Sequence, residues 1–95
     1  MKKTKRKAKG KKLKLHWIDV RVGKRIKELR LLREMTQREL GEQIGVRFQQ
    51  VQKYETGINR VSASRLFVIA KALHVGVEEL FEGWLKNGGI QRAKR

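Results

Sequence analysis

Amide and ammonium side chains gather in one short segment of the chain, residues 45–57, where they are Gln49, Gln50, Gln52 and Lys53. If this segment is a helix with Val51 at the centre of its buried face, a step of about 100° per residue places Gln49 and Lys53 almost opposite Val51. Gln can bind adenine at N6 and N7, and Lys or Arg can bind guanine at O6 and N7. Such a face can therefore contact base edges, although a merely solvated polar helix face would have the same composition.

Arg47 and Phe48 stand at the start of the same predicted helix, where side chains project beyond the helix end. Arg47 adds a second cation that can bind guanine. For Phe48 two interpretations remain open. It can make apolar contact with a thymine methyl group, or it can pack over the preceding turn, because its position around the helix lies close to the buried side.

Two further helices are predicted before this segment. Asp19 can cap the first, which ends near residue 35 and has the apolar stripe Val22, Ile26, Leu29 and Leu32. Thr36 and Glu39 have the spacing of a capping box at the start of the second helix, which runs to about Ile44. Gly45 can end that helix in a left-handed conformation.

The pattern continues with two helices after the segment. Gly57 ends the third helix, and Ser62 starts a fourth with the apolar stripe Leu66, Ile69, Ala70 and Leu73. After Gly76 a fifth apolar stripe follows, made of Val77, Leu80, Phe81, Trp84 and Leu85. Two short helices joined by a tight Gly45 turn form a helix-turn-helix arrangement. The second helix of such a pair enters the DNA major groove, which accounts for the polar face of residues 45–57.

The net charge of +16 is unevenly distributed. Residues 1–15 contain nine Lys and Arg and no acidic residue, whereas residues 19–82 contain twelve basic and nine acidic residues. We therefore divide the chain into a disordered basic arm (1–16), a helix-turn-helix DNA-binding domain (17–86) and a flexible basic tail (87–95). The expected partner of the arm is a polyanion, either nucleic acid or an anionic membrane, although a solubilising tail would have the same charge.

Several classes of function find no support in the sequence. There is no Cys, and the only histidines are His16 and His74, so we expect no metal and no cofactor. No apolar run has the length of a membrane span, and no apolar segment of a signal peptide follows the basic N-terminus. Neither a nucleophile–base pair nor a phosphate-binding loop is visible, so we expect neither an enzyme nor a small-molecule sensor.

Residues 23–81 resemble the XRE-type helix-turn-helix family of phage repressors, Cro proteins and short bacterial regulators. The pattern lies in Gly23-Lys24-Arg25-Ile26, Thr36-Gln37-x-x-Leu40-Gly41, Ile44-Gly45-Val46, Val51-x-x-Tyr54-Glu55-x-Gly57 and Leu66-x-x-Ile69-Ala70-x-x-Leu73. The resemblance implies an all-α, compact five-helix fold like that of lambda repressor. The chain departs from the pattern at Arg47, where many members have Ser or Thr as the helix cap, and at Gly41, where many have Ala.

The resemblance also implies roles for individual residues. Base edges would be contacted by Arg47, Phe48, Gln49, Gln52 and Lys53. Backbone phosphates would be bound by Gln37, Gln50, Asn59, Arg60 and Arg65. A pair that forms an internal salt bridge in several members matches Arg30 and Glu55, and would tie the first helix to the end of the third.

A single helix-turn-helix unit covers only a few base pairs, so we expect a homodimer on double-stranded DNA. The proposed dimer interface is the fifth stripe, residues Val77, Leu80, Phe81, Trp84 and Leu85. The alternative is that Leu80 and Phe81 simply close the core.

The sequence thus predicts a cytoplasmic, nucleoid-associated bacterial regulator, most simply a repressor. An antitoxin-type protein that binds a partner toxin as well as DNA is the alternative from another class. RNA binding is a further alternative, which the groove-entering helix disfavours relative to duplex DNA.

Overall fold

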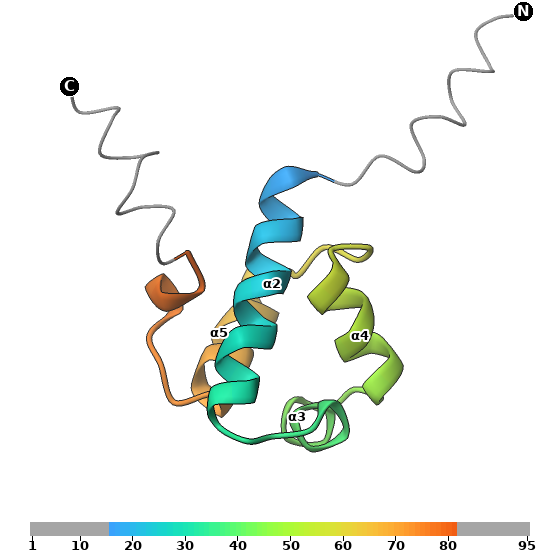
Figure 1. Cartoon of the computed structure of the whole chain (residues 1–95), viewed down its shortest axis with the longest axis vertical. Helices are drawn as coiled ribbons and strands as arrows, with labels where there is room; N and C mark the ends of the chain where they lie inside the picture. The colour runs from blue at the N-terminus through green and yellow to red at the C-terminus, as the bar shows by residue number, and fades with distance from the viewer. Residues whose placement is uncertain (1–15, 82–95) are drawn as a thin grey trace, which may run out of the picture.

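A computed structural model of the chain describes residues 16–81. This part contains α2 (Trp17–Leu32), α3 (Gln37–Ile44), α4 (Phe48–Thr56), α5 (Ala63–Ala72) and the 3-10 helix η1 (Val77–Phe81), with no strand among the described residues (Figure 1). The all-α fold class is confirmed. Residues 1–15 of the predicted basic arm and the whole predicted C-terminal tail lie outside the described residues.

The first helix begins earlier than predicted. Its N-cap is His16, whose Nδ1 accepts a hydrogen bond from the backbone N–H of Ile18 at 3.2 Å, so Asp19 lies inside the first turn and is not the cap. At this position the carboxylate faces the positive end of the helix dipole. Leu29 is the last residue of the predicted apolar stripe that is buried in the core, and Leu32, one turn later, is 75% exposed.

The helix-turn-helix pair has the local signals that the sequence predicts. The Thr36 hydroxyl accepts a hydrogen bond from the N–H of Glu39 at 3.0 Å, and the Glu39 carboxylate accepts one from the N–H of Thr36 at 2.8 Å. Gly45 ends α3 with φ 81°, and Gly57 ends α4 with φ 85°. Both angles lie in the left-handed region that glycine adopts without steric cost.

The core joins all five elements. The fully buried large side chains come from each of them in turn and are Ile26, Leu40, Val51, Ile69, Leu73 and Leu80. α2 packs against α4 on one side and η1 on the other, and α3 packs against both α4 and α5 (Figure 1). This packing leaves the outer side of α4 facing solvent.

The fifth element differs from the predicted interface helix. It is a short 3-10 helix, held to α2 by the Arg25 guanidinium, which donates to the Glu79 carbonyl at 2.8 Å. Leu80 is 1% exposed and closes the core of its own chain, so it is not available to a second copy. Val77 and Phe81 are half-buried against the same core, and Trp84 and Leu85 lie outside the described residues.

Candidate nucleic-acid interface

The outer face of α4 carries side-chain hydrogen-bond donors that have no partner in the described structure. Gln49, Gln52 and Lys53 are exposed, as is Arg47 at the N-cap, and Gln50 is half-buried. Within residues 16–81 none of these side chains has a hydrogen bond or an ion pair. The structure therefore brings together on one side of one helix most of the residues predicted to contact bases, with their polar groups available to a ligand.

Beneath this face lies a buried ion pair between Arg30 of α2 and Glu55 of α4. The side chains are 8% and 2% exposed, and Arg30 Nε lies 2.6 Å from Glu55 Oε2. Arg30 Nη2 donates to Glu55 Oε1 at 3.1 Å, and Nη1 donates to the Met35 carbonyl at 2.8 Å. The predicted pair is thus present, with the two-pronged geometry that fixes orientation best.

Gln37 is partly buried and joins the ion pair to a third helix. It is the first residue of α3, and its Nε2 donates to Glu55 Oε1 at 3.0 Å. Glu55 therefore links three helices, since it accepts from α2, from α3 and lies on α4. The predicted phosphate-binding residue Gln37 is held at the N-terminus of α3, where backbone N–H groups and the helix dipole favour an anion.

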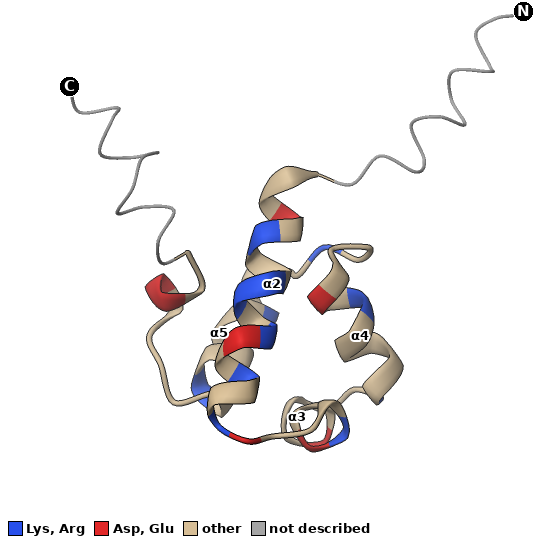
Figure 2. Cartoon of the chain, viewed as in Figure 1, with Lys and Arg blue, Asp and Glu red and all other residues tan. Residues whose placement is uncertain are grey.

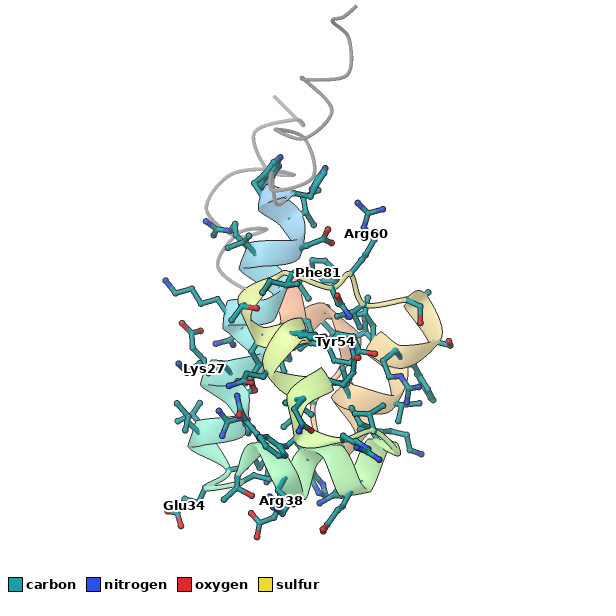
Figure 3. All side chains as sticks on the ribbon, turned by 90° about the vertical axis from the view of Figure 1, so that its right-hand side faces the viewer. Lys27, Glu34, Arg38, Tyr54, Arg60 and Phe81 are labelled. Carbon is teal, nitrogen blue, oxygen red and sulfur yellow. The ribbon has the colours of Figure 1, made fainter. Side chains whose placement is uncertain are left out.

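The loop after α4 places two more of the predicted phosphate-binding residues. The backbone N–H of Asn59 donates to the Lys53 carbonyl at 3.1 Å, which ties the loop to α4. Arg60 Nε donates to Asp19 Oδ2 at 3.1 Å, yet the Arg60 side chain stays 74% exposed. Figure 3, which turns α4 toward the viewer, shows Arg60 projecting from the loop beyond one end of α4.

Arg65, the fifth residue predicted to bind a phosphate, has a partner within its own chain. Its Nη1 donates to the carbonyl of Ile44, the last residue of α3, and the bond is partly buried. Arg65 therefore binds a carbonyl at the negative end of the α3 dipole. Its role in this structure is to hold α5 to the turn between α3 and α4.

Phe48 is neither fully exposed, as contact with a thymine methyl group would favour, nor fully buried over the turn. The side chain is half-buried, and the guanidinium carbon of Arg38, on α3, sits 4.9 Å from the centre of its ring. The pair borders a hollow next to the N-terminus of α4, lined by Arg38, Glu42, Val46, Arg47, Phe48 and Gln49. Arg38 was missed by the sequence analysis, because its contact crosses the turn between two helices and follows no helical spacing.

Charged residues are interspersed over the described residues. Lys and Arg occur on each of the four α-helices, and Asp and Glu lie among them (Figure 2). No cluster of His, Asp and Glu within residues 16–81 could hold a metal ion, and no helix there is long and apolar enough to cross a membrane. Positioned hydrogen-bond donors on α4 therefore distinguish this face better than charge alone.

Comparison with known proteins agrees with this geometry. The helix-turn-helix family HTH_3 matches residues 26–80. An uncharacterised HTH-type transcriptional regulator of Sinorhizobium fredii is 54% identical over 68 residues, which are 72% of this chain and 48% of that protein. The chain thus spans about half the length of that regulator.

Solved structures share the fold. The restriction-modification controller protein C.AhdI from Aeromonas hydrophila has 30% identity and a TM-score of 0.67, covering 70% of this chain and 100% of that one. The c2 repressor of P22, solved in complex with a synthetic operator, has 26% identity and a TM-score of 0.60 over 65% of this chain and 94% of its own. These matches confirm the resemblance seen in the sequence, and the chain belongs to the helix-turn-helix family.

Proposed function

We propose that this chain is a sequence-specific transcriptional regulator that binds double-stranded DNA, acts as a repressor and works on chromosomal DNA in the bacterial cytoplasm. The observation that carries the proposal is the row of unpaired donors on α4, held by a buried three-helix cluster. The names of similar proteins support it, since they are transcriptional regulators and a repressor solved with an operator.

In this mechanism α4 lies in the major groove and presents Gln49, Gln52 and Lys53 to base edges. Gln can bind adenine in a bidentate manner, and Lys can donate to guanine. Gln37 and the first N–H groups of α3 would bind a phosphate at one side of the groove. Asn59 and Arg60 would bind one near the other end of α4. Phosphate contacts fix the position of the protein on the duplex, and base contacts provide the sequence preference.

We further infer that two copies bind one operator, because one helix-turn-helix unit covers only a few base pairs. Since Leu80 is buried in the core, the interface would use Val77, Phe81 and the residues beyond them, among which Trp84 and Leu85 lie outside the described residues. The nine cations of residues 1–15 would add affinity that depends on salt and little sequence preference.

Replacing Gln49 and Lys53 together with Ala should remove most of the sequence preference. Each bidentate base contact contributes about 1–3 kcal/mol of discrimination, so each loss weakens binding to the preferred duplex roughly 5- to 150-fold. Binding to a scrambled duplex should change far less. Fluorescence anisotropy at near-physiological salt measures both dissociation constants, with the preferred duplex taken from a random library selected by the full chain.

Lys71→Ala is the matched control, since Lys71 is an exposed cation on α5. It should leave the ratio of the two dissociation constants unchanged. Both side chains of the double variant are exposed, so its thermal melt should match that of the wild type. An equal loss on the preferred and scrambled duplexes would show that α4 contributes only charge, and would reject base contact by these residues.

A further inference from the structure

Arg38 is an oriented but otherwise unpaired cation. Its guanidinium carbon lies 4.9 Å from the centre of the Phe48 ring, within the range of a cation–π interaction. Arg38 is exposed, and within residues 16–81 its side chain interacts with the Phe48 ring alone. A guanidinium that lies over a ring face keeps its N–H donors for other acceptors. Phe48 therefore holds in place a cation whose donors have no acceptor in the described structure.

The position of Arg38 relates it to the proposed DNA face. It follows Gln37 in the first turn of α3, at the helix end that favours anions. In Figure 3 Arg38 lies below α4 and Arg60 lies above it, so the two arginines project at opposite ends of this helix. In a helix-turn-helix protein the first helix of the pair crosses the DNA backbone. A cation on this helix therefore lies nearer to a backbone phosphate than to a base edge.

We propose that Arg38 binds a backbone phosphate of the operator and that Phe48 is its positioning residue. This inference rests on the proposed function. Arg suits the task because its planar fork matches two phosphate oxygens, and stacking in advance reduces the conformational freedom lost on binding. Glu42 lines the same hollow, and its negative charge disfavours a phosphate beside it. The phosphate is therefore expected at the outer edge of the guanidinium.

The proposal also decides between the two interpretations of Phe48. The Phe48 ring is half-buried, and the Arg38 guanidinium covers one of its faces. Phe48 then affects DNA binding through Arg38 and not through a thymine methyl group. Removing the ring should have the same consequence as removing the cation, and removing both should be no worse than removing Arg38 alone.

The test compares Arg38→Gln, Phe48→Leu and the double variant in the full chain. Dissociation constants are measured on the preferred and a scrambled duplex over a salt series. The slope of log K against log salt is negative, and loss of one phosphate contact should make it less negative by about 0.9, with the same fold-change on both duplexes. Phe48→Leu should also make the slope less negative, and Phe48→Tyr, which keeps the ring, should retain the wild-type slope.

Lys71→Gln is the control, because Lys71 also sits over a ring, with Nζ 5.9 Å from the centre of Phe67, but on α5. It should not change the slope. An unchanged slope for Arg38→Gln would overturn the proposal. So would a Phe48→Leu loss that disappears when uracil replaces thymine in the duplex, since Phe48 would then contact the methyl group. If the wild type does not distinguish the two duplexes, the proposed function fails, while the slope still reports whether Arg38 touches a phosphate.

Discussion

Replacing Arg30 with Ala is expected to lower the melting temperature by roughly 12 °C or more. Glu55 is 2% exposed and would lose two charge-assisted hydrogen bonds, keeping only the one from Gln37. Removing one partner of a buried ion pair costs about 3–5 kcal/mol, because the other charge stays buried without compensation. For a domain of this size each kcal/mol corresponds to about 4–8 °C. This is a large part of a total stability of about 5–15 kcal/mol.

A thermal melt followed by circular dichroism measures the change. Lys27→Ala, at an exposed position of the same helix, is the control and should lie within about 0.5 kcal/mol of the wild type. The double variant Arg30→Met with Glu55→Leu should recover part of the stability, since apolar replacement of a whole buried pair is often neutral. A melting temperature within a few degrees of the wild type for Arg30→Ala would show that the pair does not hold α4 in place.

Replacing Gly23 with Ala is expected to destabilise the domain by about 3 kcal/mol or more. Gly23 lies in the interior of α2, where Ala would ordinarily gain about 1 kcal/mol in helix propensity. Here, however, an added Cβ would lie 2.2 Å from the Tyr54 carbonyl oxygen and 2.7 Å from that of Glu55. Both oxygens belong to the backbone of α4 and cannot rotate away. α4 must therefore move as a unit, and its donors move with it.

Gly45→Ala separates this effect from a conformational one. Gly45 has φ 81° and nothing within 4 Å of an added Cβ, so only the left-handed backbone opposes Ala, at about 1–2 kcal/mol. Denaturant unfolding of both variants gives the comparison. Gly23→Ala should be the less stable and should also lose preference for its duplex. A Gly23→Ala protein more stable than the wild type would mean that α2 and α4 are not in close backbone contact.

Local signals in the sequence predicted local structure well. The capping box of Thr36 and Glu39 and the glycine ends of α3 and α4 depend on residues only a few positions apart, and each is present. The Arg30–Glu55 pair spans 25 positions and was accessible only through resemblance to a family. The hydrogen bond of Gln37 to Glu55 and the contact of Arg38 with Phe48 depend on how helices pack, which spacing along one helix does not encode.

Packing also decides contacts that the sequence did not predict. Arg65 was predicted through the resemblance to bind a phosphate, and packing of α5 against the end of α3 gives its Nη1 a backbone carbonyl as well. Leu80 fits an apolar stripe of an interface helix, but the chain after Gly76 forms a short 3-10 helix that turns Leu80 into the core. An apolar stripe indicates that a face is buried, and does not indicate whether the same chain or a second copy covers it.

The central claim is that α4 determines which DNA sequence this chain binds. Selection of bound sequences from a random duplex library at near-physiological salt tests it most directly, using the full chain and a version that starts at Leu15. We predict one palindromic motif shared by both proteins, with half-sites about one helical turn apart. Enrichment of no motif by either protein would contradict the claim, because binding would then depend on charge and not on the side chains of α4.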